Sequence, residues 1–204
     1  MITLHQRWLD AWTGLALAGD PAWLERLLAA YAESGRHYHT QQHLAECLDL
    51  VDELAHLAQR PGEVAIALWF HDAVYVPQAR DNEARSAEWA VAALCAAGAG
   101  EAVIARVQAQ VMATAQHAAT GDGDTQLVVD IDLAILGAAP ARFAQYAQQV
   151  RAEYAAVPEA VYKVKRRAVL AGFLERPALY ATPALHARLE QQARRNLQRA
   201  VAAR

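Results

Sequence analysis

The sequence predicts an all-α protein, a single-domain helical bundle of roughly nine to ten helices. The chain is rich in alanine and has few β-branched runs, which favours helix. Its apolar residues recur at spacings of three and four, and proline or N-capping residues open several segments. With 204 residues, 55% of them hydrophobic and 20% charged, the chain can bury a real core. No repeat, low-complexity linker or domain boundary stands out, so we expect residues 1–204 to form one domain.

The first three helices are predicted from their apolar spacing and their start signals. The first covers about 3–18 and carries two tryptophans at helical spacing. The second begins at Pro21 with Asp20 as its N-cap, a strong start signal. The third follows Thr40, a plausible N-cap, and its apolar positions continue to Leu54.

The apolar segment 65–75 is predicted as a buried helix around which the chain is organised. It carries His71 and Asp72 side by side, which places an imidazole and a carboxylate near one point. A buried, unpaired carboxylate is costly, and a metal ion meets that cost. Imidazole with carboxylate suits Zn, Mn, Fe or Ni. The alternative is a satisfied core histidine beside an aspartate that accepts local hydrogen bonds.

Six further helices complete the predicted bundle, with Asp81 as the N-cap of the first and prolines opening the last three. Their expected ranges are 82–98, 100–117, 127–137, 140–154, 158–174 and 183–203. The apolar run 127–137 fits a strand or a buried helix, and its length and its Gly137 stop favour helix. It contains Asp130 and Asp132, which lie about 200° apart on a helix, so at most one should face His71 and Asp72.

Three histidines fall within the seven residues 37–43, around the start of the third helix. His37 is expected in a solvated loop, and His39 just outside the helix. His43 lies in the first turn, near the core side, where a ligand role and a structural role are equally compatible with the pattern. His117, at the end of the predicted helix 100–117, is favoured there by the helix dipole or could approach a metal site.

Charge and cysteine content limit the classes of partner and compartment. The formal net charge of −3 gives no sign of a nucleic-acid surface, so no nucleic-acid polymer is expected as a partner. The N-terminus lacks a signal-peptide pattern, and no uncharged apolar stretch reaches membrane-spanning length. Cys47 and Cys95 lie in apolar helical contexts and are expected to be buried free thiols, which fits a reducing compartment. We therefore expect a cytoplasmic protein that has no membrane partner.

The ordered set His43, then His71-Asp72, then Asp132 resembles the HD-domain superfamily of metal-dependent phosphohydrolases. Longer motifs are similar to a bacterial subfamily of predicted HD phosphohydrolases and extend the likeness over nearly the whole chain. They are Arg36-x-Tyr38-His39-Thr40-x-x-His43, Leu68-Trp69-Phe70-His71-Asp72-Ala73-Val74-Tyr75, Asn82-Glu83-x-x-Ser86 and Asp130-x-Asp132-Leu133-x-Ile135. Four ordered elements are far more specific than the His-Asp doublet alone, and they favour an HD-domain-like fold and a metal site.

The resemblance also implies roles for individual residues. The metal ligands would be His43, His71, Asp72 and Asp132, which leaves Asp130 a structural or outer role. Glu83 or His39 would transfer protons, and Arg36 or Arg166 would stabilise a phosphate. His117, with His39, could bind a second metal ion or contact the substrate.

The function implied is hydrolysis of a small phosphate ester, such as a nucleotide, through a metal-activated water. The cofactor would be a divalent metal ion, with Mn, Zn, Fe, Mg, Co and Ni all compatible with a mixed nitrogen and oxygen ligand set. Two alternatives stay open: a di-iron HD-type oxygenase or oxidase, and a non-catalytic HD-fold binding module. A homo-oligomer formed through the tryptophan-bearing N-terminal helices is also compatible with the sequence.

Overall fold

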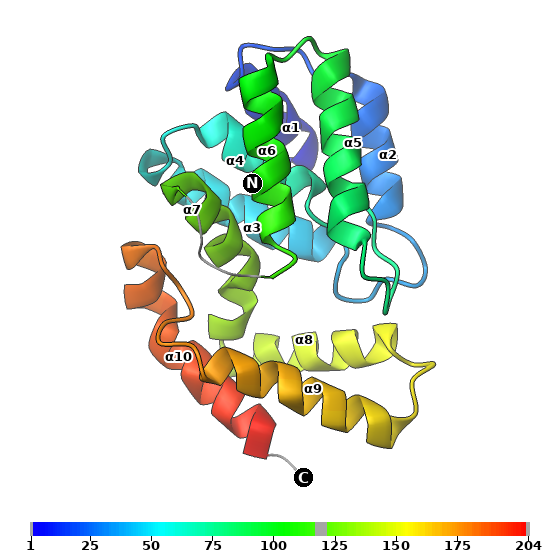
Figure 1. Ribbon diagram of the computed structural model, residues 1–204, viewed down its shortest axis with the longest axis vertical. Coiled ribbons are helices and arrows are strands. Elements are labelled where there is room, and N and C mark those ends of the chain that lie inside the picture. Colours follow the sequence, from blue (N-terminus) through cyan, green and yellow to red (C-terminus); the bar gives the residue numbers. More distant parts are fainter. Residues whose placement is uncertain (1, 117–121, 203–204) are drawn as a thin grey trace. The chain divides into compact units, whose positions relative to one another are not determined.

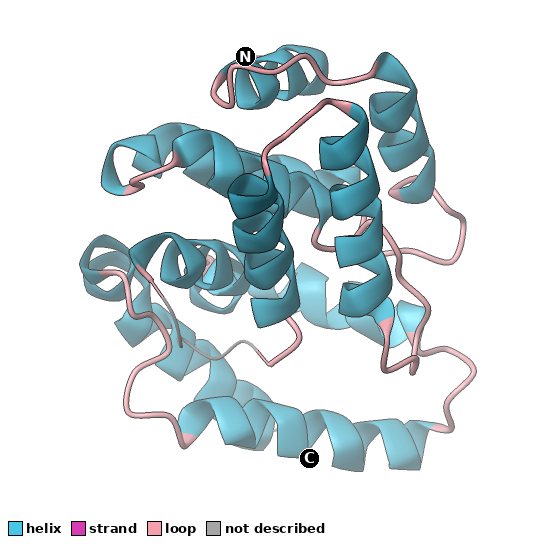
Figure 2. Ribbon diagram, turned by 45° about the horizontal axis from the view of Figure 1, so that its top comes forward, coloured by secondary structure: helices cyan, strands magenta, loops and turns pink. Residues whose placement is uncertain are grey.

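The computed structural model describes residues 2–116 and 122–202, and the regular elements within those ranges are all helical (Figures 1 and 2). The predicted all-α fold class is therefore confirmed. The described residues form α1 Leu4–Thr13, α2 Pro21–Ala30, α3 Gln41–Leu54, α4 Pro61–Phe70, α5 Asn82–Ala96, α6 Glu101–Ala113, α7 Gly123–Asp132, α8 Pro140–Glu153, α9 Glu159–Leu174 and α10 Pro183–Ala202. Two short 3₁₀ helices, η1 Ala55–Leu57 and η2 Leu133–Gly137, follow α3 and α7.

Contacts along the chain divide it into two compact units. The first unit is Met1–Asp132 and contains α1 to α7, and the second is Leu133–Arg204 and contains η2 and α8 to α10. The expectation of one domain over residues 1–204 stays a prediction. All residues of the candidate site described below belong to the first unit.

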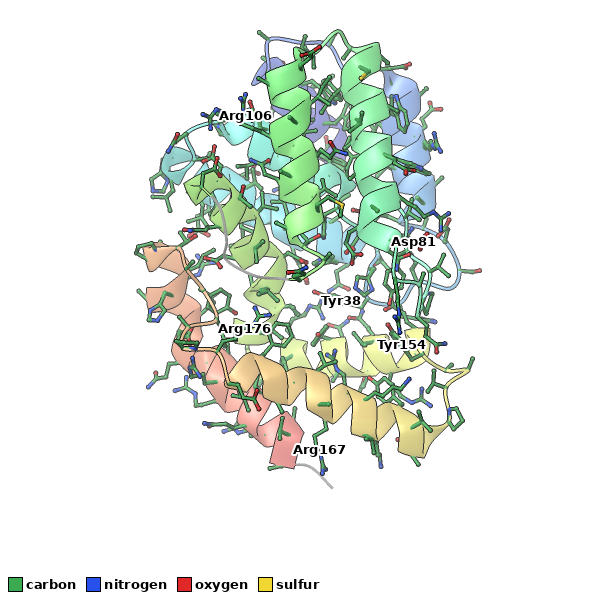
Figure 3. All side chains as sticks on the ribbon, in the orientation of Figure 1. Tyr38, Asp81, Arg106, Tyr154, Arg167 and Arg176 are labelled. Carbon is green, nitrogen blue, oxygen red and sulfur yellow. The ribbon has the colours of Figure 1, made fainter. Side chains whose placement is uncertain are left out.

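Helix α4 is the centre of the first unit. Each of its residues from Gly62 to Phe70 is buried, and it packs against α1, α3, α5, α6 and α7. Its one buried acid, Glu63, accepts two hydrogen bonds from the guanidinium of Arg106 on α6, at 2.6 and 2.7 Å. Arg106 is labelled in Figure 3. Because α4 is apolar on all sides, its neighbours must surround it, and this determines how the first unit is arranged.

The caps predicted at Asp20 and Thr40 are confirmed, the one predicted at Asp81 is wrong, and Thr3 is a further cap that was not predicted. Side-chain oxygens of Thr3, Asp20 and Thr40 accept backbone N–H groups in the first turns of α1, α2 and α3. Asp81 was predicted to cap α5, but its side chain makes no capping hydrogen bond. The neighbouring Asn82 instead bonds back to the backbone N–H and carbonyl of Val76, both at 3.0 Å. The loop before α5 is therefore anchored by the first helical residue.

The predicted helix 65–75 is wrong at both ends, because α4 begins at Pro61 and ends at Phe70. His71 and Asp72 occupy the turn that follows α4. Two carbonyls of this turn accept hydrogen bonds from the Arg36 guanidinium, at 2.6 Å for Asp72 and 2.9 Å for Ala73. The Arg36 guanidinium, from a distant part of the chain, thus donates to carbonyls that would otherwise accept backbone N–H groups if the helix continued.

The apolar run predicted as one helix over 127–137 is divided in the structure. Helix α7 starts four residues earlier and ends at Asp132, and η2 continues to Gly137. At this start, Asp122 Oδ1 accepts the backbone N–H of Thr125 at 2.9 Å and caps the helix. The buried carboxylate of Asp124 accepts the backbone N–H groups of Gln59 at 2.7 Å and Arg60 at 2.9 Å. These bonds join the start of α7 to the start of α4.

The second unit holds η2 against α10 with buried polar groups. The side-chain amide of Asn196 donates to the carbonyls of Leu136 and Ala138, both at 2.9 Å, and the Tyr180 hydroxyl donates to the Leu133 carbonyl at 3.0 Å. A Cβ at Gly137 would come within 2.6 Å of a leucine side chain on α10, so glycine permits this close approach. Helices α9 and α10 also pack together.

The N-terminal tryptophans are core residues rather than surface residues. Trp8 and Trp12 on α1 are almost fully buried, and Trp8 packs edge-on against Trp69 of α4 with ring centroids 5.3 Å apart. These two rings therefore offer no surface for the oligomer considered from the sequence.

Candidate metal centre

Four side chains from three elements meet at one point in the first unit. His43 comes from the first turn of α3, His71 and Asp72 from the turn after α4, and Asp132 from the end of α7. Each offers one nitrogen or oxygen atom, and the four atoms all lie within 4.8 Å of one another. The structure thus brings together the four residues that the sequence predicts as ligands.

The ligand atoms are close enough to share one ion. The Nε2 atoms of His43 and His71 are 3.1 Å apart. Asp72 Oδ2 lies 3.5 Å from the first and 3.1 Å from the second. Asp132 Oδ1 lies 3.3 Å from the first and 3.5 Å from the second. Two nitrogens and two carboxylate oxygens form a donor set that suits Zn and other transition metals.

Hydrogen bonds outside the cluster orient these side chains. Nδ1 of His71 lies 2.8 Å from the Leu68 carbonyl, so this nitrogen donates its N–H to that carbonyl and Nε2 is directed into the cluster. The Arg36 bonds to the carbonyls of Asp72 and Ala73 hold the turn that carries both residues of the doublet. Ser86 on α5 accepts the backbone N–H of Val74 at 3.0 Å and holds the same turn from the other end.

The cluster electrostatically favours positive charge at its centre. Burial opposes the charged form of His71, but Asp72, Tyr31 and Asp132 outweigh it and hold the pKa of His71 well above its usual range. Burial likewise opposes the charged form of His43, yet Cys47, Tyr38 and the two carboxylates raise its pKa well above the usual range. Burial would raise the pKa of Asp72, but the neighbouring histidines keep it well below normal. A cation at this point would take the place of the protons that the imidazoles attract.

The cluster is buried on its imidazole side and more open on its carboxylate side. The side chains of the two histidines are 1 to 2% exposed, whereas those of Asp72 and Asp132 are 17% and 12% exposed. Tyr38, labelled in Figure 3, packs against His43 with ring centroids 4.7 Å apart.

The residues predicted for catalysis lie around this cluster rather than in it. His39 is half-buried and stacks on Tyr75 with ring centroids 4.0 Å apart, and its charge lowers the pKa of Asp72. Glu83 is half-buried in the first turn of α5, one turn before Ser86. Arg36 is buried, and its guanidinium bonds to the two carbonyls described above and to Glu33. These catalytic roles stay predictions.

Three other residues named from the sequence are accounted for separately. Asp130 is fully buried on α7 and lies outside the cluster that contains Asp132. Arg166 belongs to the second unit, where its guanidinium donates to the Tyr146 hydroxyl at 2.6 Å. His117 lies outside the described residues.

Cys47 lies close to this site, and the sequence did not predict its position there. Cys47 Sγ lies 3.7 Å from Nδ1 of His43 and 3.8 Å from its Nε2, and Cys47, His43 and His71 form a second group of close donors. The i, i+4 spacing of His43 and Cys47 on one helix was the signal available in the sequence. Cys95 was expected to be buried, but it is exposed on α5 because it lies on the outer face of that helix.

Comparison of the chain with models of known protein families, with curated proteins and with solved structures finds no match. The likeness to the HD superfamily therefore remains a resemblance in residues and motifs. Among the described residues, no helix is both long enough and apolar enough to cross a membrane.

Proposed function

We propose that this protein is a metal-dependent phosphohydrolase of the HD type, which binds a divalent metal ion through His43, His71, Asp72 and Asp132. The proposed substrate is a small phosphate ester, such as a nucleotide. The observation that carries the proposal is the convergence of two imidazole nitrogens and two carboxylate oxygens at mutual distances of 3.1 to 3.5 Å for the five measured pairs.

The spacing of the donor atoms fits a bound metal ion. Nitrogen and oxygen ligands at about 2.0 to 2.2 Å from a tetrahedral ion lie about 3.3 to 3.6 Å from one another. The measured pairs fall in or near that range. The bond from His71 Nδ1 to the Leu68 carbonyl at 2.8 Å is the outer contact that ligating histidines usually make.

The chain supplies the other groups that phosphate-ester hydrolysis requires. When bound, a divalent ion supplies Lewis acidity, which polarises a phosphoryl oxygen and lowers the pKa of a water. Asp72 and Asp132 would hold the ion from the more open side of the cluster. His39, stacked on Tyr75 beside Asp72, or Glu83 on α5 would deliver a proton to the leaving oxygen of the ester. Arg36 positions the Asp72 turn.

Metal content of the purified, untagged protein tests the proposal. We expect about one transition-metal ion per chain in the wild type. The near-isosteric variants Asp72→Asn and Asp132→Asn should lose it, because each replaces a charged ligand by a neutral amide. Asp81→Asn is the matched control, since Asp81 is an exposed aspartate without a capping role. The loaded wild type is then assayed for phosphate release from p-nitrophenyl phosphate and nucleoside monophosphates.

The outcomes separate the competing functions. Metal that is lost only in the two site variants, together with phosphate release that depends on it, would support the proposal. Absence of metal in the wild type after reconstitution with Zn, Mn, Fe and Co would refute the ligand assignment and favour a binding module. About two irons per chain with substrate-dependent oxygen consumption would replace the hydrolase by a di-iron oxidase.

A further inference from the structure

Helix α9 carries apolar side chains on the face that meets water. Three of the eight large hydrophobic side chains that are exposed in the described part of the chain belong to this helix. Val161 is 44% exposed, Val164 71% and Val169 52%, whereas Leu170 is the residue of α9 that is buried. A surface helix usually turns its polar side to solvent, so the outward face of α9 is the reverse of the ordinary pattern.

Small apolar residues continue this surface along the helix. With about 100° per residue, Val161, Val164 and Ala168 lie along one line of α9. Ala160 and Gly172 border that line, and all five residues are exposed. These five residues are called the α9 stripe below. A contiguous apolar surface of this kind marks interaction sites more often than single scattered residues do.

Basic side chains border the α9 stripe on both sides. At the helical spacing, Lys163 and Arg167 lie on one side and Lys165 on the other, and all three are exposed (Arg167 is labelled in Figure 3). Helix α9 contains four basic residues and one acid, although the whole chain has a formal net charge of −3. That acid, Glu159, is paired with Arg151 at 2.8 Å and Lys163 at 3.6 Å. The border of the stripe is therefore positive.

We infer that the α9 stripe is a docking surface for an amphipathic helix of a partner protein. Apolar side chains of that helix would cover the stripe, and its acidic side chains would meet the basic border. The inference is independent of the proposed function, because the stripe belongs to the second unit and the four candidate metal ligands belong to the first.

Charge favours this occupant over a second copy of the chain. Two α9 stripes packed face to face would bring Lys163, Lys165 and Arg167 of both copies together, and like charges in an interface repel. Glutamate or aspartate beside the apolar side chains of a partner helix would instead be attracted to the same border. The charge pattern thus selects an acidic partner and disfavours self-association.

The size of the side chains favours a helix over a membrane surface. The stripe consists of valine, alanine and glycine, without the Trp, Phe or Leu that helices insert among lipid chains. A Cβ built at Gly172 would meet nothing within 4 Å, so this end of the stripe leaves room for side chains of another helix. Larger apolar residues, such as leucines, pack as ridges into a helix surface of small residues.

A synthetic helical peptide tests the inference on the 204-residue chain. The probe is a fluorescein-labelled peptide of about 20 residues, with leucines along one face and glutamates beside them, and the control peptide has lysines in place of the glutamates. Fluorescence anisotropy should show binding of the acidic peptide that weakens as salt is added, and much weaker binding of the basic peptide.

Variants of exposed valines locate the binding surface. Val164→Asp should weaken binding of the acidic peptide by about tenfold or more, because it places a carboxylate at the centre of the stripe. Val76→Asp is the matched control, since Val76 is an exposed valine of the first unit and its replacement should leave the affinity unchanged. Lys165→Glu provides a second comparison if Val164→Asp does not fold.

Other outcomes overturn the inference and identify what covers the stripe. If the acidic peptide does not bind the wild type, or binds Val164→Asp equally well, the stripe is not a docking surface for an acidic helix. A wild-type dimer in sedimentation that becomes a monomer in Val164→Asp would make a second copy the occupant. Binding to phosphatidylserine vesicles that is lost in Val164→Asp would make it a membrane surface.

Discussion

Replacing Arg36 by lysine should destabilise the protein even when no metal or substrate is present. Arg36 is buried and donates to the carbonyls of Asp72 at 2.6 Å and Ala73 at 2.9 Å, with a third bond to the exposed carboxylate of Glu33 at 3.0 Å. A lysine ammonium can replace one carbonyl bond but not the planar pair. One charged hydrogen bond contributes about 1.5 to 3 kcal/mol, and the Glu33 pair adds little because that carboxylate faces solvent. Arg36→Lys should therefore reduce the free energy of unfolding by about 2 to 4 kcal/mol.

Urea unfolding of the chelator-treated protein, followed by tryptophan fluorescence, measures this difference. Trp69 lies in α4, two residues before His71, and reports on this part of the core. Arg80→Lys is the matched control, because Arg80 is exposed in the loop before α5 and should change stability by less than about 0.5 kcal/mol. A loss below about 1 kcal/mol for Arg36→Lys would contradict the positioning role. An unchanged stability with a raised KM for a phosphate ester would instead support direct phosphate binding.

Three further predictions concern packing, proton linkage and buried polar groups. Gly62→Ala should lower the unfolding free energy by about 1 to 3 kcal/mol, because its Cβ would lie 2.8 Å from the backbone that follows α1. Gly35→Ala, which meets nothing within 4 Å, should leave the thermal midpoint nearly unchanged or slightly raised. Metal affinity measured by calorimetry should rise with pH and level off above the raised pKa values of His43 and His71, because the ion must displace protons from both imidazoles. A metal affinity that falls as pH rises would contradict this prediction. Asn196→Leu should cost about 2 to 3 kcal/mol in denaturant unfolding, since it leaves two carbonyls at the end of η2 without their donor; no measurable change would refute it.

The helix pattern was largely readable from the sequence because its signals are local. The capping side chains of Asp20 and Thr40 act within two residues along the chain, so residue type and spacing predict them well. Asp81 has the right residue type at the right position, yet its side chain makes no capping bond. A residue type that can cap a helix therefore does not ensure that it does.

Where residues far away in the sequence form hydrogen bonds with backbone groups at a helix end, the sequence did not predict the structure. Helix α4 ends at Phe70, although the apolar pattern continues to Tyr75. The carbonyls beyond that point are bound by Arg36, which lies 36 residues earlier than Asp72 in the sequence. In the same way, Asp124 in the first turn of α7 accepts N–H groups from a segment 64 to 65 residues away. No local propensity encodes such partners.

The sequence alone determined the all-α class and most helix starts, and it indicated the set and order of four candidate ligands. These depend on residue chemistry and short-range spacing, which are present in any conformation of the chain. Only the tertiary structure decided that the four donor atoms lie within 4.8 Å of one another and that Cys47 lies beside His43. Those facts depend on how α3, α4 and α7 pack, because a side chain's direction becomes a contact only when a second element is placed against it.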